Sequence, residues 1–226
     1  MTKDVNPIYE DICNSIITLK LKPGEKISEI ESSRKYNVSR TPIRDVFKRL
    51  EDNNLLEIRS QSGTFVTKIN MTNIADLVYI RNCCEFAVLC EISGKLTQEN
   101  ADYLYANLEE QTRLSKEGFS DEDFSLEYFS LDNKFHQYLY SLGSREGVLK
   151  LLNLDQVNFQ RYRFATFLRD EGELERLNKV HSSMVDALMK NDLVRLKKIV
   201  YDHNYSGLNG IDSVIYKHPD YFERDN

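Results

Sequence analysis

The chain has little glycine and proline, with nine Gly and four Pro among 226 residues. This scarcity argues against a low-complexity or disordered chain, and a hydrophobic content of 41% is enough to bury a core. No apolar run is long enough to cross a bilayer. Because residues 1–7 also lack the apolar segment of a signal peptide, we expect a cytoplasmic protein without a membrane partner.

Cysteine is also scarce, and its spacing excludes two common uses of the residue. The four cysteines form no Cys-x-x-Cys pair and no metal knuckle, and a reducing compartment keeps them as thiols. We therefore interpret them as helix-packing residues. They are Cys13, Cys83, Cys84 and Cys90.

The chain lacks the excess of positive charge typical of a protein that coats nucleic acid, because its formal net charge is −6. That sum hides an asymmetry along the chain. Residues 32–68 carry eight Lys and Arg against four Asp and Glu, whereas the remainder is acidic. The positive charge is therefore concentrated near the N-terminus.

Two helical patterns open this N-terminal region. Apolar residues at helical spacing follow Pro7, and Lys22-Pro23-Gly24 is expected to end the first helix. Ser28 and Glu31 have the spacing of a capping box, which predicts a second, short helix that runs to about Tyr36.

A third helix is predicted from Arg40, after a turn for which Asn37 is suited, with Ser39 or Thr41 as its cap. One face of this helix is apolar at the spacing i, i+3, i+4 and i+7, and a second face is cationic at i, i+4 and i+8. The apolar face contains Ile43, Val46, Phe47 and Leu50, and the cationic face contains Arg40, Arg44 and Lys48.

Residues 55–60 and 64–69 predict two strands joined across Gln61-Ser62-Gly63, with Gly63 where a positive φ is needed. Three helices followed by such a hairpin form a winged helix-turn-helix. Two interpretations compete for its cationic helix, a solvated charged face or a DNA-recognition helix, and the helix-turn-helix context favours DNA. Arg40 and Arg44 suit guanine or phosphate, and hydroxyl groups suit phosphate oxygens.

Long helical patterns without strand signals follow residue 71 and indicate an antiparallel bundle. The predicted helices are Thr72–Ser93, Thr97–Glu117, Asp121–Leu142, Arg145–Leu168, Glu171–Lys190 and Asp192–Ser206, the last capped by Asp192. We therefore predict a mainly α protein with a winged helix-turn-helix domain at 1–70, an all-helical domain at 71–210 and an unassigned tail at 211–226.

Four stretches of the N-terminal region resemble the DNA-binding domain of GntR-family bacterial transcriptional regulators. They are Pro23-Gly-Glu-Lys-Ile-Ser-Glu29, Val38-Ser-Arg-Thr-Pro-Ile-Arg-Asp45, Arg49-Leu-Glu51 and Gly63-Thr-Phe-Val66. The resemblance implies that residues of the third helix contact DNA and that Gly63 lies at the wing tip, near the minor groove. Together with the residues chosen above, the predicted DNA-binding set is Ser39, Arg40, Thr41, Arg44, Lys48, Arg49 and Gly63.

The chain departs from that family pattern at two places in the same region. Ile30 stands where many relatives carry Arg, which removes one expected DNA contact. Asn53-Asn54 replaces an acidic-Gly pair, and because Asn tolerates the same backbone conformation we expect the turn to be kept.

Three of the four histidines fall in the predicted bundle. Asp132 and His136 are four residues apart and share one helical face, and His181 and His203 lie on the fifth and sixth predicted helices of that region. Antiparallel neighbours could bring all four residues to one level of the bundle. Each histidine alone is more often a packing or surface residue than a ligand. Together, three imidazoles and a carboxylate suit Zn²⁺, Ni²⁺ or Mn²⁺ and leave positions open for water or ligand oxygens.

This second region resembles the FCD effector domain of one GntR branch, whose metal motif is Asp-x-x-x-His followed by two helical His. The resemblance implies that Asp132, His136, His181 and His203 bind a divalent metal. It also implies that Arg81 and Glu85 face an effector, with Arg81 clamping a carboxylate; a simple Arg81–Glu85 salt bridge is the alternative. Arg161 and Arg163 are weaker candidates for the same pocket, and His218 is left outside it.

The resemblance implies a ligand-responsive regulator, not an enzyme, that binds inverted-repeat operators in double-stranded DNA as a homodimer. A small carboxylate effector would change the DNA affinity; repression released by the ligand is the commoner arrangement among relatives, and activation is the alternative. Two alternatives stay open. One is a metal-dependent hydrolase with a DNA-binding appendage, and the other is a regulator whose metal is structural or is itself the signal.

Overall fold

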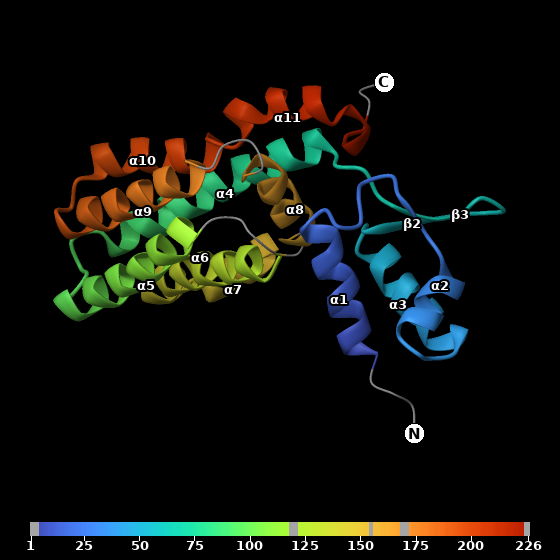
Figure 1. Ribbon diagram of the computed structural model, residues 1–226. Helices are drawn as coiled ribbons and strands as arrows, with labels where there is room; N and C mark the ends of the chain where they lie inside the picture. The colour runs from blue at the N-terminus through green and yellow to red at the C-terminus, as the bar shows by residue number, and fades with distance from the viewer. Residues whose placement is uncertain (1–4, 118–121, 154–155, 168–171, 224–226) are drawn as a thin grey trace.

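The computed structural model describes residues 5–117, 122–153, 156–167 and 172–223. Within them the chain forms a small head at residues 5–66 and a larger helical bundle at residues 71–217, joined by a linker at 67–70 (Figure 1). The head contains α1 (Asn6–Ile17), β1 (Lys26–Ile27), α2 (Glu29–Lys35), α3 (Arg40–Asp52), β2 (Leu56–Arg59) and β3 (Gly63–Val66). The bundle contains α4 (Met71–Ile92), α5 (Gln98–Glu117), α6 (Glu122–Leu142), α7 (Glu146–Leu152), α8 (Gln156–Phe167), α9 (Glu173–Met189), α10 (Leu193–Tyr205) and α11 (Ile211–Lys217). The predicted fold class is confirmed.

The helix-turn-helix of the head forms where its caps and apolar spacing predict. All four residues of the predicted apolar face of α3 are buried in the core of the head. The backbone N–H of Glu31 donates to Ser28 Oγ (3.4 Å), and Asn37 adopts a φ of 51° in the turn before α3. Ser39 precedes α3 as predicted, but its side chain makes no capping hydrogen bond.

The first helix ends earlier than predicted, at Ile17 rather than at Lys22-Pro23-Gly24. The hydroxyl of Thr18 donates back to the carbonyl of Asn14 (2.8 Å), and Leu19 adopts a φ of 57°. This turn directs Leu19 away from the head and into a core cluster of the bundle, where it is 7% exposed. Packing against the bundle therefore overrides the local helical pattern.

The wing is an antiparallel hairpin of β2 and β3 in which Arg59 lies opposite Gly63. Both strands are shorter than predicted, and the turn contains positive φ angles at Gln61 (60°) and Gly63 (118°). Asn54 has a φ of 55°, which confirms that Asn keeps the left-handed turn before the hairpin. The two-residue strand β1, too short to predict, pairs with β3 and gives the order β1-β3-β2.

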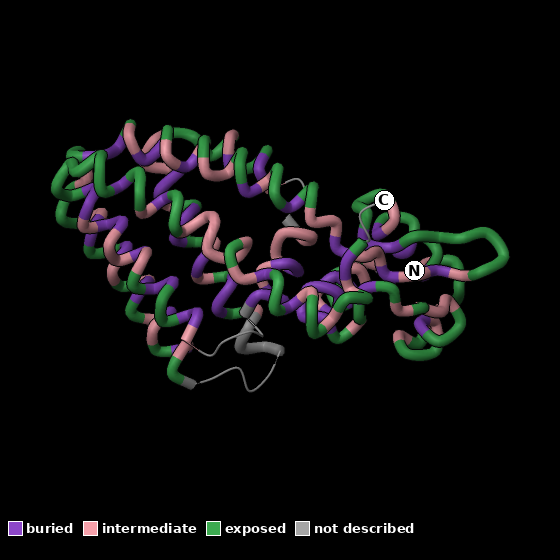
Figure 2. The backbone as a smooth tube through the Cα atoms, turned by 90° about the horizontal axis from the view of Figure 1, so that it is seen from above, coloured by how far each residue is buried: buried purple, intermediate pink, exposed green. Residues whose placement is uncertain are grey.

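In the bundle, α10 packs against α4 and α9, and α5 packs against α6 and α9. The tube coloured by burial shows that buried positions recur along these helices and alternate with exposed ones (Figure 2). Side-chain caps fix the starts of two helices. Asn70 Oδ1 accepts from the N–H of Asn73 (2.9 Å), and Asp192 Oδ1 accepts from that of Arg195 (3.0 Å), which confirms the predicted cap.

The single helix predicted for Arg145–Leu168 is wrong, because α7 and α8 are separate helices. Both contact α4, but their other partners differ: α7 also lies on α6, whereas α8 also contacts α1 and α11. Figure 1 shows α8 across the end of the bundle, between the bundle and the head. One straight helix could not reach both places. The predicted helix ends at Asp121, Leu168 and Glu171 lie outside the described residues.

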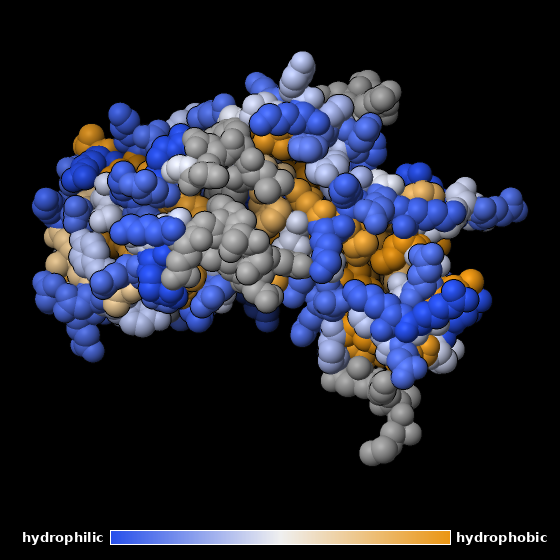
Figure 3. Space-filling view, viewed as in Figure 1, coloured by the Kyte–Doolittle hydropathy of each residue, from blue (hydrophilic) through white to orange (hydrophobic). Residues whose placement is uncertain are grey.

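The predicted unassigned tail forms α11 and then returns to the linker. Phe222 bridges Ile69 in parallel, and the N–H of Ile69 donates to the carbonyl of Tyr221 (2.8 Å). Ile69 and Phe222 join Leu19 in one core cluster with residues of α4, α6 and α8. On the face seen in Figure 3, apolar surface gathers near the meeting of head and bundle, within a border of hydrophilic side chains.

All four cysteines are free thiols, as predicted. The packing role predicted for them holds for Cys13, which is buried in the core of the head, but not for Cys83, which is exposed on α4. In the described part of the chain, no helix combines the length and the apolar character needed to traverse a membrane.

Candidate DNA-binding surface and metal centre

The predicted cationic face of α3 is exposed in the head. Arg40 and Arg44 have side-chain exposures of 52% and 60%, and Lys48 of 63%. Figure 1 places α3 and the hairpin in the half of the molecule that lies away from α5, α9 and α10. The three cations therefore lie on a surface that a duplex could approach. Lys48 also pairs with two acidic residues one turn further on, Glu51 (2.9 Å) and Asp52 (3.2 Å).

Glu29, at the start of α2, holds two of these cations together. Its Oε2 accepts from Arg40 Nη2 and from Arg44 Nε, each at 2.9 Å. Burial opposes ionisation of Glu29, but hydrogen bonds from both arginines leave its pKa below the ordinary value. Sequence reasoning missed this residue as a functional candidate. The only available signal was its position within the first matching stretch, because the contact spans two helices.

Arg49 does not join this group. Nine residues separate it from Arg40, which is about two and a half helical turns, so it points to the opposite side of α3. Its guanidinium donates to Asn6 Oδ1 (3.0 Å) and lies over the ring of Tyr9, 4.3 Å from the centroid. The structure thus places Arg49 against α1.

The wing brings further cations together near Gly63. A Cβ on Gly63 would lie 2.5 Å from Lys26 Cε, so the absence of a side chain lets Lys26 of β1 pass close by. Arg59 lies over the ring of Phe65, 4.6 Å from its centroid, and pairs with Glu57 (2.8 Å). Lys26 was missed because the sequence did not predict β1.

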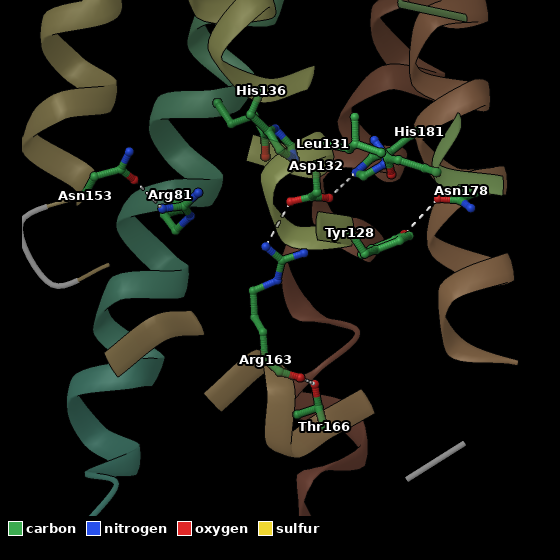
Figure 4. A network of polar contacts seen from close by, with 12 residues as sticks. Arg81, Tyr128, Leu131, Asp132, His136, Asn153, Arg163, Thr166, Asn178 and His181 are labelled. Atoms are coloured by element: carbon green, nitrogen blue, oxygen red, sulfur yellow. Dashed lines mark hydrogen bonds and ion pairs between the residues drawn. The ribbon is translucent and has the colours of Figure 1, made fainter. Parts of the chain in front are cut away.

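The three histidines of the bundle meet at one level, as their spacing predicts. His136 comes from α6, His181 from α9 and His203 from α10, and one ligand nitrogen of each lies within 4.8 Å of the others. Asp132, one turn before His136, lies beside them, with its Oδ1 3.8 Å from His181 Nε2 (Figure 4). Two ligands on opposite sides of one ion at ~2.1 Å would lie about 4.2 Å apart, so these distances are close to those of a metal centre.

Several polar atoms of this cluster are buried without a hydrogen-bond partner among the described residues. They are both ring nitrogens of His181, Nδ1 of His203 and Oδ1 of Asp132. Each such atom destabilises the folded state by about 1–3 kcal/mol unless it finds a partner. Burial lowers the pKa of His181 well below its ordinary value and that of His203 to about 4, so both rings are neutral near pH 7. Neutral imidazoles and a carboxylate suit Zn²⁺, Ni²⁺ or Mn²⁺ as ligands.

Charged neighbours orient the ligands. The guanidinium of Arg163, on α8, donates to Asp132 Oδ2 (2.9 Å; Figure 4). His136 Nδ1 donates to Glu85 Oε1 (2.7 Å), which directs Nε2 of His136 away from Glu85. Asn204 donates to Glu85 Oε2 (2.7 Å). Burial raises the pKa of both carboxyl groups, but Arg163 at Asp132 and His136 at Glu85 more than offset it, and both pKa values lie well below their usual range.

Arg81 does not form the alternative salt bridge with Glu85, since no ion pair joins them within the described part of the chain. Its guanidinium lies over the ring of Phe159, 4.5 Å from the centroid, and donates weakly to Asn153 Oδ1 (3.5 Å). Burial lowers the pKa of Arg81. A single pocket is lined by Arg81, Glu85, Asp132, His136, Arg163 and His203, among others. Arg161 does not line this pocket, and His218 stacks on Tyr221.

A winged helix-turn-helix with an exposed cationic helix, followed by an all-helical bundle, defines a DNA-binding transcriptional regulator. The model of the bacterial regulatory proteins of the gntR family matches residues 5–66, and that of the FCD domain matches residues 85–205. The chain belongs to the GntR family, in the branch that carries an FCD domain.

Relatives support this assignment over the whole chain. The HTH-type transcriptional repressor RspR of Escherichia coli K12 is 28% identical over 225 residues, which cover 99% of this chain and 96% of RspR. Among solved structures, E. coli McbR/YncC has a TM-score of 0.69 at 15% identity, with 96% of this chain and 100% of that one covered. A regulator from Rhodococcus sp. RHA1 has a TM-score of 0.66 at 19% identity, covering 91% and 98%. These two structures share the fold.

Proposed function

We propose that this regulator binds operator DNA through α3 and the wing, and that a divalent metal and a small carboxylate in the bundle control that binding. The division into a DNA-binding domain at 1–70 and an effector and dimerisation domain at 71–210 follows from this proposal. The observation that carries the DNA part is the exposed group of Arg40, Arg44 and Lys48 on a helix-turn-helix. Because the proposed target is bacterial DNA, a cytoplasmic location is part of the same proposal.

The metal part rests on donor atoms of Asp132, His181 and His203 that are buried beside His136 and have no hydrogen-bond partner among the described residues. A bound Zn²⁺, Ni²⁺ or Mn²⁺ would act as the positively charged partner of these atoms. With these four residues as ligands, an octahedral ion keeps positions open for an oxygen ligand.

The effector part rests on the cations around the same pocket. Arg81 is half-buried and lies at the pocket. The one side-chain hydrogen bond that it makes within the described part of the chain is long, at 3.5 Å, so its planar fork is available to a carboxylate. Arg163 lies beside it, held by Asp132. A small carboxylate that reaches the metal and Arg81 together would fit this arrangement.

A homodimer is proposed because inverted-repeat operators match two-fold protein symmetry. Exposed aromatic and aliphatic side chains on adjacent helices offer a contact surface: Tyr79 (63% exposed) and Ile80 (48%) on α4, and Tyr201 (52%) on α10. Repression is the proposed output, since the E. coli relative is named a repressor.

The DNA part is tested by measuring operator and mixed-sequence binding at fixed salt. Arg40→Ala is expected to weaken binding to the operator by about 1–3 kcal/mol and to relax the sequence preference. Lys48→Ala is expected to weaken binding to the operator and to the mixed-sequence duplex by similar amounts. An unchanged operator affinity in both variants would contradict the assignment of α3.

The metal part is tested by calorimetric titration of chelator-stripped protein with Zn²⁺. One ion per chain is expected for the wild type and for His218→Ala, and none of comparable affinity for His181→Ala. Unfolding of the bundle in His181→Ala would instead favour a structural ion. Turnover of small esters by the Zn²⁺-loaded protein would favour the hydrolase alternative, which lacks an identified general base beyond the ligands.

A further inference from the structure

Helix α8 presents two different faces to two different parts of the molecule. Phe159 and Arg163, four residues apart, line the pocket of the proposed metal and effector site. Val157 and Arg161, also four residues apart, face the head: Val157 packs against the core of the head, and Arg161 reaches the linker. Residues two apart on an α-helix point about 200° from each other, so the two pairs lie on opposite sides of α8.

Among the described residues, Arg161 is the largest side chain that is almost fully buried, at 1% exposure. Its Nη1 donates to the carbonyl of Thr67 (2.8 Å), and its Nη2 donates to the carbonyl of Lys68 (3.2 Å) and to Asn158 Oδ1 (2.9 Å). The planar guanidinium therefore binds two consecutive carbonyl groups of the linker and also forms a hydrogen bond within its own helix. Charge-assisted hydrogen bonds of this kind are stronger than neutral ones, and here they tie the linker to α8.

The linker is also fixed on a second side. Ile69 exchanges backbone hydrogen bonds with the C-terminal tail, donating to Tyr221 (2.8 Å) and accepting from Glu223 (3.0 Å). β3 enters the linker directly from the wing, and α1 packs against α8. Helix α8 thus contacts the head in two ways, directly at α1 and through the linker that follows β3, so a shift of α8 would act on both.

At its other face, α8 is tied to the metal ligands. Arg163 donates to Asp132 Oδ2 (2.9 Å), and its guanidinium lies 5.0 Å from the ring centroid of Phe129 on α6. Phe159 lies under Arg81 of α4. A ligand that binds Asp132 or Arg81 would change the contacts that these residues make with Arg163 and Phe159 of α8.

We propose that Arg161 is a positioning residue through which α8 transmits changes at the metal and effector site to the linker and hence to the DNA-binding head. This proposal rests on the proposed function, because it assigns a route for regulation from that site. Because the pocket and the linker contact opposite sides of the same helix, the fork of Arg161 is the contact by which α8 holds the linker. Arg163 is the input of this route and Arg161 its output.

The experiment is a double-mutant cycle in metal-free full-length protein, read by hydrogen–deuterium exchange. Arg163→Gln disturbs the site, Arg161→Gln releases the linker, and the double variant combines them. Exchange is followed at residues 128–136 of α6 and at the linker 67–70, with α5 as the internal reference for global opening. Arg145→Gln is the matched control, because Arg145 pairs on the surface with Glu91 (3.0 Å).

We expect Arg163→Gln to speed exchange at both segments and Arg161→Gln to speed it at the linker about tenfold. In the double variant, the linker should exchange as in Arg161→Gln alone, while residues 128–136 respond as in Arg163→Gln. The proposal would be overturned if Arg163→Gln left the exchange rate of the linker unchanged, or if the effects of the two substitutions on that rate were additive in the double variant. If Arg161→Gln fails to fold, Arg161→Lys replaces it; with one donor group instead of a fork it should lose most of the coupling, and full coupling would overturn the role of the fork.

A second arm adds Zn²⁺ to separate this proposal from the proposed function. In wild type, Zn²⁺ should slow exchange around His136, His181 and His203 and also at the linker, and Arg161→Gln should keep only the first effect. Absence of any Zn²⁺ protection would contradict the metal site, and the metal-free cycle would still decide the route. Linker protection that persists in Arg161→Gln would overturn the route alone.

Discussion

The head and the bundle use charge in opposite ways. In the head, Arg40 and Arg44 share Glu29 at the surface, where side-chain exposures are 52%, 60% and 27%. In the bundle, Arg163 and Asp132 pair at exposures of 13% and 1%. Exposed pairs are worth about 0–1 kcal/mol and exchange readily for DNA phosphates, whereas removing one partner of a buried pair leaves an uncompensated charge. The exposed ion pairs of the head can therefore be replaced by contacts with DNA at little cost, whereas the buried pair of the bundle is costly to separate.

The largest expected effect is the loss of Arg163. Arg163→Met should lower the free energy of unfolding of metal-free protein by about 3–5 kcal/mol, because the buried carboxylate of Asp132 then lacks the guanidinium that pairs with it. Zn²⁺ should restore much of this stability by pairing with Asp132. Urea unfolding with chelator and with Zn²⁺ measures both quantities.

Arg145→Met is the surface control for that measurement. Arg145 and Glu91 are 46% and 45% exposed, so its loss should change the free energy of unfolding by about 1 kcal/mol or less. Equal losses in the two variants would remove the distinction between buried and exposed pairs.

Acid should affect the bundle before the head. Burial lowers the pKa of His203 from 6.5 to about 4, so the unfolded chain binds a proton that the folded chain does not, and stability is lost as pH falls from about 6.5 to 4. This single group accounts for about 3 kcal/mol by pH 4. In the head, Glu29 has a pKa lowered from 4.5, so its contribution is kept above pH 4.5 and lost only below it.

Urea unfolding of chelator-treated protein at pH 7 and pH 5 tests this order. His203→Gln, which does not titrate, should show a smaller loss between the two pH values than the wild type. The same dependence in both proteins would show that His203 does not cause the acid sensitivity.

Local patterns in the sequence predicted much of the fold and of both candidate sites. Spacing along one helix places Ile43 and Phe47 on the buried face of α3, and it places Asp132 one turn before His136. These features depend on helical geometry alone, which the sequence encodes within a few residues. Helical patterns also predicted the helices that carry His181 and His203, and the family resemblance singled out these two residues as candidate ligands.

Features that depend on packing between distant segments could not be predicted in this way. The pairing of Glu29 with Arg40 requires the crossing of α2 and α3, and the division between α7 and α8 reflects their different neighbours. Arg161 was a weak candidate for the pocket, yet it faces the linker instead. Its direction is set by where α8 meets the head, which no local pattern records.

The smallest expected effect concerns the shared carboxylate of the head. Glu29→Gln removes the negative charge that Arg40 and Arg44 both contact, so these cations need not leave an ion pair to reach DNA phosphates. Binding to a mixed-sequence duplex at 50 mM salt should strengthen by about 1 kcal/mol, and the gain should shrink at 200 mM salt.

Glu31→Gln is the matched control, since it removes one negative charge from the same helix α2, where Glu31 is exposed and makes no ion pair among the described residues. A gain confined to Glu29→Gln would show that the shared pair competes with DNA, because both variants change the net charge equally. Equal gains in the two variants would attribute the effect to net charge, and the cations of α3 would then be as free to bind DNA with Glu29 as without it.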